Sequence, residues 1–354
     1  MICPHCQQNL LYKERGGLKC SKCKREFAFE PKTNPLRLHD ARFRDATAKL
    51  AGAGIKLYFT AGQLQHFLSR KYVKNSFQTV RGWLTFGLIA SFATCFLAIF
   101  LLHSIAFFLL GLIVSAGFGG FLIVYRKTEG ARSLPQTRLD FEQNVLMRWR
   151  KIYGNLPPHL LARNSSPDAA ILENVRGALF CPEPEIIVCL AANQTLQNLG
   201  LIGLDSVQTT TGGKLEFIRQ SPNLPIFILH DASAQGYLFK EDFINRHLGG
   251  NSSNRPIYDL GLRPQTAIKK NLLRLREKTV AGATTNLDGL TAEETAWLSE
   301  GNCTPLLALT PTQLIKMVTR GVAASKRRAA TTPKNNLPPP NAAQAIGFMT
   351  WIGK

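Results

Sequence analysis

Acidic residues are scarce in this chain. Its 354 residues include 23 Asp and Glu against 43 Lys and Arg, which gives a formal net charge of +20. The excess is uneven, because residues 1–81 hold 16 basic and 5 acidic side chains, whereas residues 126–354 hold 27 and 18. This balance argues against a strongly cationic partner. It favours a partner rich in negative charge, either a nucleic acid or an anionic lipid.

Common catalytic signatures are also missing. Four histidines show neither HExxH spacing nor triad spacing (His39, His159, His230 and His247). The segment TTTGGK at 209–214 lacks the spacing and the Lys-Ser/Thr ending of a P-loop. Cys181, Cys189 and Cys303 each stand alone, which is more typical of buried residues than of nucleophiles. The first apolar block lies too deep in the chain for a signal peptide, so we expect none.

Ionised residues are absent from 82 to 125. One membrane helix takes roughly 20 residues, so this stretch predicts a two-helix transmembrane hairpin that turns near His103-Ser104. Trp83 and Tyr125 stand at its ends, where aromatic side chains favour the membrane interface. The alternative is a buried hairpin in a soluble core, and it is weaker because such helices rarely continue for two spans without a charge.

Lys and Arg residues flank this stretch on both sides. By the positive-inside rule, they predict an integral protein of the cytoplasmic membrane with both termini cytoplasmic. The lipid bilayer would then be one partner of the protein. Part of the net charge would therefore reflect topology rather than affinity for nucleic acid.

Four of the eight cysteines lie within the first 23 residues, as CPHC (Cys3, Cys6) and CSKC (Cys20, Cys23), with 13 residues between the pairs. Two such knuckles supply four thiolates, which is a closed tetrahedral site suited to structural zinc. A segment of about 30 residues cannot build its own core, so the metal would supply the folding energy. These cysteines, with CKREFAF after them, resemble the zinc-ribbon family. The alternative is four unliganded thiols.

The chain from Glu185 onward alternates between apolar runs and helical patterns. We predict strands at 185–190, 206–211, 224–231 and 256–262, with helices at 193–201, 214–220 and 234–248 between them. This order predicts a parallel sheet that is covered by helices on both faces. Asp231 is the last residue of the third of these strands, and ligands of open α/β sheets gather at the carboxyl ends of strands.

Further elements are predicted outside this sheet. We expect an amphipathic helix at 37–52, a strand at 56–59, a helix capped by Thr60 and a basic helix at 139–154. Thr291 and Glu294 form a capping-box pattern, and a further helix is expected at 310–322. The segment from 325 to 354 is basic and Pro-rich and is predicted to be disordered.

The segment HDASAQGY is similar to the Asp-x-Asp-x-x-Gly segment of toprim domains, the Mg²⁺-binding α/β fold of topoisomerases, primases and related nucleases. Asp231 aligns with the first Asp, Ser233 with the second and Gly236 with the glycine. The predicted strand and helix order ahead of this segment also matches. The family places a glutamate after its first strand, and the predicted first strand ends in CLAANQ without an acid, because Glu183 and Glu185 precede it.

A second resemblance lies upstream. YFTAGQLQHF is similar to the winged-helix segment of the topoisomerase VI A-subunit and the meiotic double-strand-break protein, which carries a catalytic tyrosine. Thr60, Gln63 and Leu64 match that segment. Gly62 stands where the family has arginine, and Gln65 and His66 occupy its tyrosine positions.

Together these observations predict a multidomain membrane protein. The domains are a zinc ribbon at 1–30, a small winged-helix-like segment at 31–81, a transmembrane hairpin at 82–125, a cytoplasmic α/β toprim-like domain at 126–324 and the tail at 325–354.

The departures from the family matter for function. Mg²⁺ chemistry on phosphodiesters needs several carboxylates, whereas Asp231 and Ser233 offer one charged group. We therefore expect a catalytically degenerate binding or scaffold module for a cytoplasmic protein or a nucleic acid, and a homo-oligomer is left open. One alternative is a Mg²⁺-dependent nuclease or topoisomerase-like enzyme that combines Asp231 with Asp259 or Glu173. The other is a generic α/β domain in which Asp231 caps the following helix.

Overall fold

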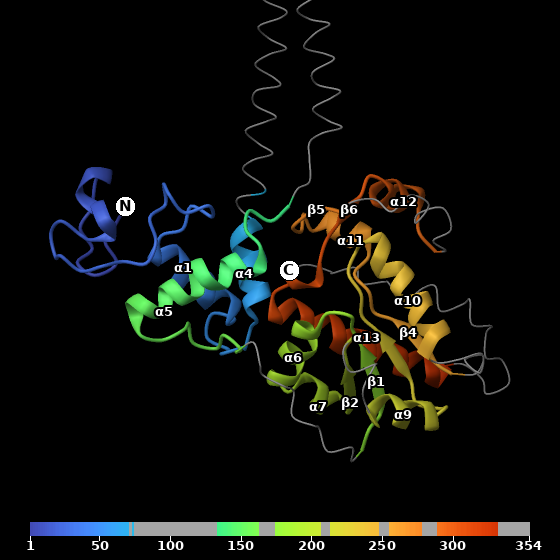
Figure 1. The fold of residues 1–354 in the computed structure, drawn as a ribbon. Coiled ribbons are helices and arrows are strands. Elements are labelled where there is room, and N and C mark those ends of the chain that lie inside the picture. Colours follow the sequence, from blue (N-terminus) through green and yellow to red (C-terminus); the bar gives the residue numbers. More distant parts are fainter. Residues whose placement is uncertain are drawn as a thin grey trace, which may run out of the picture.

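The computed structural model describes residues 1–70, 73, 133–162, 174–206, 213–247, 255–277 and 289–331. These residues form a cysteine-rich segment, a group of helices and an α/β domain (Figure 1).

The N-terminal part contains few regular elements before its helices. A short 3-10 segment, η1 (Tyr12–Leu18), lies between the two cysteine pairs. It is followed by α1 (Asp40–Leu50) and by a helix at 61–70. A continuous helix then runs through α4 (Arg138–Phe141), a π-helical turn η2 (Glu142–Met147) and α5 (Arg148–Tyr153). The expected helices at 37–52 and 139–154 are thus confirmed in type and place.

A buried carboxylate joins three segments of this part. Asp40 is 1 % exposed, and its carboxylate accepts hydrogen bonds of 2.9 Å from the backbone N–H groups of both Ala28 and Phe29. The hydroxyl of Tyr153 on α5 also donates to Asp40. The rings of Phe29, Phe43 and Trp149 pack beside this network. The chain that leaves the cysteine pairs is therefore attached to both helices by polar and aromatic contacts.

The α/β domain is built on a parallel sheet. Its strands are β1 (Gly177–Phe180), β2 (Leu201–Leu204), β3 (Ile226–Ile228) and β4 (Ile257–Asp259), in the order β2-β1-β3-β4. All three strand pairs are parallel. The first strand therefore lies inside the sheet, and the chain order changes direction between β1 and β3.

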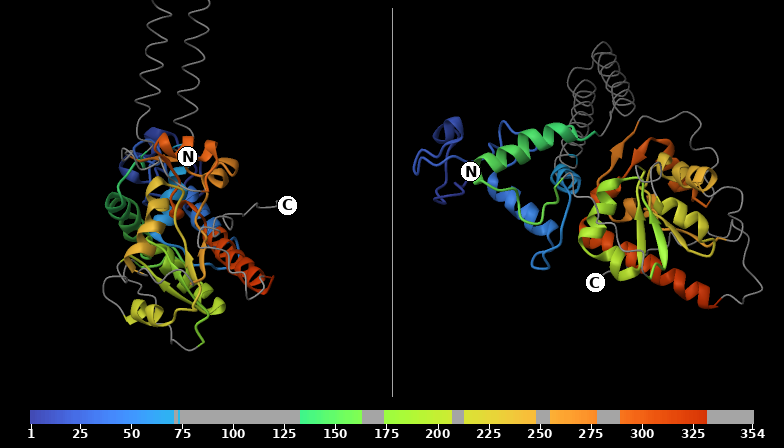
Figure 2. Two further views of the ribbon diagram at one scale, coloured as in Figure 1. Left: turned by 90° about the vertical axis from the view of Figure 1, so that its right-hand side faces the viewer. Right: turned by 60° about the horizontal axis from the view of Figure 1, so that its bottom comes forward.

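Helices cover both faces of this sheet (Figures 1 and 2). Leu179 and Phe227 pack on one face, in a cluster that includes residues of α6 (Pro184–Ala192), α7 (Thr195–Leu199), α11 (Pro264–Lys269) and α13 (Pro311–Thr331). Phe180 and Ile228 pack on the other face against residues of α9 (Gly213–Gln220) and α10 (Ala234–His247). Strands buried on both faces read as continuous apolar runs, which is why the parallel class could be predicted.

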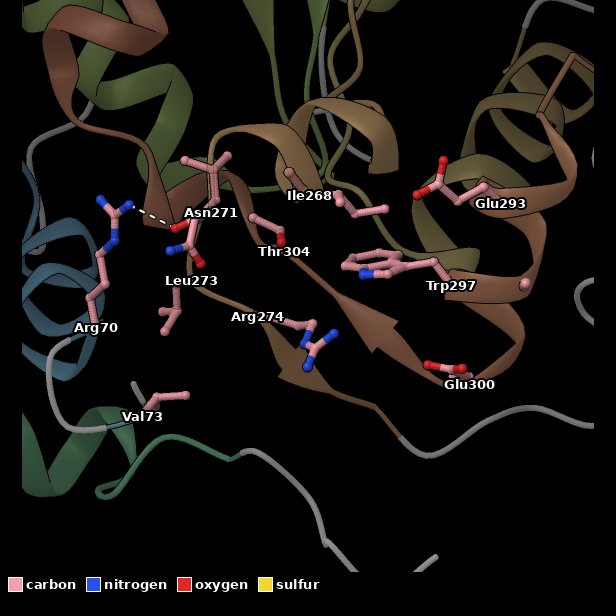
Figure 3. Close-up of a pocket in the computed structure, with 13 residues that line it drawn as sticks. Arg70, Val73, Ile268, Asn271, Leu273, Arg274, Glu293, Trp297, Glu300 and Thr304 are labelled. Atoms are coloured by element: carbon pink, nitrogen blue, oxygen red, sulfur yellow. Dashed lines mark hydrogen bonds between the residues drawn. The ribbon is translucent and has the colours of Figure 1, made fainter. Parts of the chain in front are cut away.

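A second, antiparallel sheet of two strands stands beside the first. It pairs β5 (Leu275–Arg276) with β6 (Asn302–Cys303), between which lies α12 (Ala292–Ser299), and a 3-10 turn η4 (Leu306–Ala308) follows. The predicted capping box is confirmed, because Thr291 Oγ1 accepts from Glu294 N and Glu294 Oε2 accepts from Thr291 N. Residues of α11, α12 and the helix at 61–70 line a cavity of about 510 Å³, together with the segment ahead of β5 and Thr304 after β6 (Figure 3).

Two strand predictions are wrong. Residues 185–190 lie in helix α6, and the first strand is instead the four-residue segment β1 that precedes them. Pro184 at the first turn of α6 favours a helix start, because its missing N–H would have no partner there. The expected strand at 56–59 is reduced to one isolated parallel bridge between Phe59 and Leu160. Most of the strand expected at 206–211 lies outside the described residues.

The predicted membrane class is corrected. Within the part of the chain that the structure describes, no helix is both long enough and apolar enough to cross a bilayer. The longest described helix, α13, has 21 residues but carries Lys316, Arg320, Lys326 and Arg327. The expected hairpin at 82–125 lies outside the described residues. The described residues form a cysteine-rich segment, a helical part and a parallel α/β domain. They give no support to the expected membrane location with two cytoplasmic termini.

Helix α13 ends at Thr331, beyond the start of the tail that we expected at 325.

Candidate functional site

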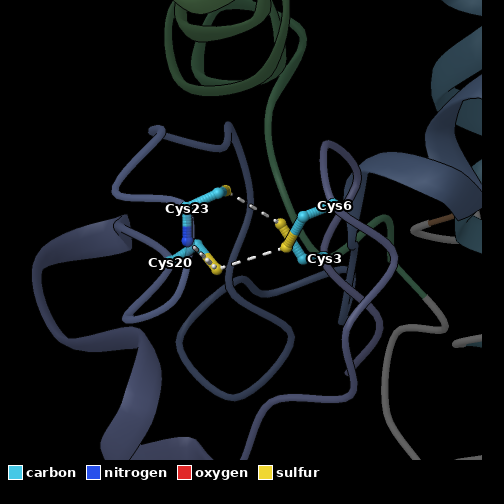
Figure 4. Close-up of side chains that lie close together, drawn as sticks. All are labelled: Cys3, Cys6, Cys20 and Cys23. Atoms are coloured by element: carbon cyan, nitrogen blue, oxygen red, sulfur yellow. Dashed lines mark hydrogen bonds between the residues drawn. The ribbon is translucent and has the colours of Figure 1, made fainter.

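The four N-terminal cysteines converge on one point (Figure 4). Their Sγ atoms all lie within 4.8 Å of one another, and the Cys3–Cys23 and Cys6–Cys20 pairs are each separated by 3.8 Å. All four are free thiols. Backbone amides point at the sulfurs, because His5 N lies 3.5 Å from Cys3 Sγ and Cys23 N lies 3.4 Å from Cys20 Sγ. This arrangement could hold a metal ion such as zinc.

A second candidate site lies at the carboxyl edge of the parallel sheet. Ligands of open α/β sheets bind where the strand order changes direction, which here is between β1 and β3. Glu183 follows β1, and Asp231 follows β3. Both residues, with Ser233 and Gln235, line a cavity of about 320 Å³. The sheet topology thus brings two carboxylates to one opening.

Asp231 is held by Ser233. The hydroxyl of Ser233 donates to Asp231 Oδ1 over 2.7 Å, and its Oγ accepts the N–H of Gly236 over 2.9 Å. Ser233, and not Asp231, therefore caps the start of α10. Gly236 is needed for close approach, since a Cβ at this position would lie 2.3 Å from Asp231 Oδ1. Burial raises the pKa of Asp231, although the bond from Ser233 and the nearby His230 act against this shift.

Glu183 was missed by the sequence analysis as part of this site. The predicted strand at 185–190 puts it before the first strand, at the wrong edge of the sheet. Burial raises the pKa of Glu183, and the negative charges of Glu185 and Asp231 add to that shift. The signal that could have located it was Pro184, which marks a helix start and so makes Glu183 the end of a strand-to-helix connection.

A third carboxylate lies in the same region. Burial raises the pKa of Glu277, which follows β5, and the charge of Asp231 contributes to the shift. The loop after β3 is joined to this side of the domain by a bridge between Ala232 and Thr304. Among the described residues, however, the cysteines form the only group of three or more His, Cys, Asp or Glu ligands close enough to hold a metal ion. The charge of Asp231 thus affects the pKa values of Glu183 and Glu277, but the three carboxylates do not form a complete metal-binding site.

Asp259, proposed from sequence as a partner of Asp231, makes other contacts. Its Oδ1 lies 3.2 Å from His230 Nε2 in an ion pair, although the ring N–H is not aligned for a hydrogen bond. Its Oδ2 lies 3.2 Å from Lys240 Nζ, and Gly261 N donates to Oδ1 over 2.7 Å. The other proposed partner, Glu173, lies outside the described residues.

The segment that resembles a winged helix forms the buried helix at 61–70. Gln65 is 2 % exposed and donates to the backbone oxygen of Gln136, while His66 is 7 % exposed and bonds to the oxygen of Gly62. Burial lowers the pKa of His66. Neither side chain at the family's tyrosine positions is accessible to a substrate. At Gly62, which stands where the family has arginine, a Cβ would come within 2.7 Å of Glu185 Oε2, so a side chain there would displace the Glu185 carboxylate.

The buried His230–Asp259 pair generates a pH prediction. Burial lowers the pKa of His230, but Asp259 more than offsets this effect, so the pKa in the folded protein is raised overall. The stabilisation that protonated His230 contributes is therefore complete below the ordinary histidine pKa of about 6.5, and it is lost as the pH rises through the pKa of His230 in the folded protein. Burial raises the pKa of Asp259, but His230 and Lys240 more than offset this and lower it overall, so its contribution is present above about pH 4 and is lost in stronger acid.

We therefore expect His230→Gln and Asp259→Asn each to lower the free energy of unfolding by about 3–5 kcal/mol at pH 5.5. Urea unfolding at pH 5.5 and pH 9 measures this, and the difference from the unsubstituted protein should shrink at pH 9. Asp242→Asn is the matched control on α10, because its pair with Arg246 is exposed and should be worth less than about 1 kcal/mol. Equal losses at both pH values would contradict the charged pair.

Comparison with known proteins identifies no relative. No family model, no curated protein and no solved structure matches this chain. The resemblance to toprim domains and to the topoisomerase VI A-subunit therefore stays a hypothesis that depends on the residues described above.

Proposed function

We propose that this protein is a zinc-ribbon protein that binds nucleic acid, and that its α/β domain is a toprim-like binding module without phosphodiester chemistry. The observation that carries the proposal is the surface of the cysteine-rich segment. Lys22, Lys24 and Arg25 are exposed there and have no acidic partner among the described residues, and Lys13 is a further exposed cation.

The same segment also carries an exposed aromatic side chain. Tyr12 is 50 % exposed, and Lys32 Nζ lies 4.1 Å from the centre of its ring. Phosphates are bound by exposed Lys and Arg, and single strands also stack their bases on aromatic rings. A basic surface that includes an aromatic side chain therefore supports nucleic acid as the partner over a protein.

Zinc is the metal that fits the four cysteines best. A tetrahedron with Zn–S bonds of about 2.3 Å has edges of about 3.8 Å, as in the two sulfur pairs. The apolar cluster around these cysteines contains Leu10 as its one other fully buried member. So small a core favours a structural role, in which bound metal stabilises the fold and holds the basic surface in shape.

Metal analysis tests the zinc site. We expect one zinc ion per chain, because four thiolates complete a tetrahedron. The double variant Cys20→Ser/Cys23→Ser should lose it, as measured by mass spectrometry of the purified proteins. Cys303→Ser is the control, since that thiol lies in the α/β domain and should leave the zinc content unchanged. Zinc retained in full by the double variant would refute this assignment.

Salt-dependent binding tests the nucleic-acid partner. Fluorescence anisotropy with single- and double-stranded oligonucleotides should show binding that weakens with salt. Replacing Lys22, Lys24 and Arg25 by alanine should reduce the slope of log affinity against log salt by about 0.7 per lost phosphate contact on single strands and about 0.9 on duplexes. Lys49→Ala is the matched control, because its charge is paired with Asp45 on α1. An unchanged slope in the triple variant would reject the ribbon surface as the binding site.

A second candidate function is favoured by one observation, the position of Glu183. With Glu183 after β1 and Asp231 after β3, the domain has two of the acids that a Mg²⁺-dependent nuclease or topoisomerase-like enzyme would use. Against it stand the hydrogen bond that Ser233 gives to Asp231 and the lack of a complete carboxylate cage among the described residues. Ser233 cannot supply the second negative charge that such a site needs.

Nicking of supercoiled DNA separates the two candidates. We expect purified protein with Mg²⁺ or Mn²⁺ to cleave none, because the cation would be held too weakly. If cleavage occurs, and both Glu183→Gln and Asp231→Asn abolish it while Glu26→Gln on the ribbon leaves it intact, the enzyme replaces the binding module as the function of this domain.

A further inference from the structure

The cavity of about 510 Å³ beside the small sheet has the size of a ligand site. It is lined from separate parts of the chain: Arg70 from the helix at 61–70, Asn271 and Arg274 from the connection between α11 and β5, Trp297 from α12 and Thr304 just after β6. It is distinct from the cavity that contains Asp231, and the ribbon contributes no residue to it.

One end of this cavity is basic. Arg70 Nη2 donates to the backbone oxygen of Asn271 over 2.8 Å, which fixes one edge of the guanidinium. Figure 3 shows Arg70 and Asn271 at this end and Arg274 between it and α12. A planar guanidinium that is anchored on one side presents its remaining N–H groups in a fixed fork, which suits a phosphate.

The other end is acidic. Glu293 and Glu300 are exposed, and with Trp297 they follow helical spacing along one face of α12 and its C-terminal cap. These carboxylates are acceptors only, so they suit a ligand that brings N–H donors to this end. A ligand that is wholly anionic or wholly cationic would meet repulsion at one end of the cavity.

One polar group between these ends is left without a partner. Thr304 is fully buried, and its Oγ1 has no hydrogen-bond partner among the described residues. Trp297 lines the same cavity and carries an indole N–H, which can donate a hydrogen bond. Buried polar groups are rarely left unpaired, so the Thr304 hydroxyl indicates that a ligand supplies the missing bond.

We propose that this cavity binds a nucleotide with a guanine base, whose phosphate lies at Arg70 and whose base lies beside Trp297. The adjacent N–H donors of guanine match the carboxylate of Glu293, because Glu300 Oε2 already accepts from Asn302 Nδ2 over 3.0 Å. The ring acceptors of guanine match the Thr304 hydroxyl and the indole N–H. The proposal goes beyond the ribbon surface and does not depend on it. The same chemistry is offered by a free nucleotide and by the 5′-phosphorylated end of a strand.

Thr304 connects this cavity to the edge of the parallel sheet. Its backbone N–H donates to the oxygen of Ala232 over 3.0 Å, and Ala232 N donates back to Thr304 O over 3.1 Å. Ala232 directly follows Asp231. The nucleotide would therefore lie next to the segment that carries the Asp231 site.

Isothermal titration of the full chain tests the site with GMP, guanosine, ribose 5-phosphate and UMP. GMP should bind about tenfold more tightly than UMP, guanosine or ribose 5-phosphate. The reason is that only GMP makes charge-assisted hydrogen bonds at both the basic and the acidic end of the cavity. Arg70→Gln should weaken GMP by about tenfold and leave guanosine unchanged. Glu293→Gln should weaken GMP and guanosine alike and leave ribose 5-phosphate unchanged.

Two control variants and one dinucleotide probe complete the test. Arg246→Gln on α10 and Glu216→Gln on α9 remove equivalent charges away from the cavity and should bind GMP like the unsubstituted protein. The dinucleotide pGpA distinguishes the sources: tighter binding than GMP assigns the cavity to a strand end, and weaker binding assigns it to the free nucleotide. The inference is overturned if neither GMP nor pGpA binds, if UMP binds as tightly as GMP, or if Arg70→Gln has no effect. Ribbon variants that lose oligonucleotide affinity but keep GMP would leave it standing.

Discussion

The parallel pairing of β1 with β3 is the constraint on which the α/β domain depends. Backbone hydrogen bonds in this register place Phe180 opposite Ile228, so the chain leaves both strands at the same edge. Glu183 and Asp231 then line one opening although 47 residues separate them in sequence. The same pairing puts Leu179 and Phe227 on one face and Phe180 and Ile228 on the other. One register therefore sets both the core and the position of the acids.

Contacts across the buried helix at 61–70 connect the helical part to this domain. Gly62 N donates to Glu185 Oε2 over 2.9 Å, and Gln63 Nε2 donates to the oxygen of Leu309 over 3.2 Å. Arg70, at the end of the same helix, reaches Asn271. Because this helix makes these contacts, little of its surface is accessible to a substrate. Its buried Gln65 and His66 are held by hydrogen bonds to the backbone oxygens of Gln136 and Gly62.

Charge is distributed differently over the three candidate regions. The cysteine-rich segment carries exposed cations around a compact thiol cluster, which suits long-range attraction of a polyanion. At the sheet edge, burial raises the pKa values of Glu183 and Asp231, and the charges of Glu185 and Asp231 add to the shift of Glu183. The cavity beside the small sheet has both signs at opposite ends. On the proposals above, the cysteine-rich segment would contact the nucleic-acid backbone and the cavity would bind a single nucleotide.

Local chemistry was sufficient to predict several features from sequence. The cysteine spacing determined the thiol cluster, the Thr291–Glu294 box determined a helix start, and apolar runs determined a parallel sheet. Only the tertiary structure decided which run was β1, because a short apolar run such as 185–190 has the same composition in a buried strand and a buried helix. Because β1 precedes Glu183, this residue lies at the sheet edge with Asp231. The partners of Arg70 and Thr304 could not be predicted from the sequence either. They depend on contacts between residues that are distant in sequence, which no local pattern encodes.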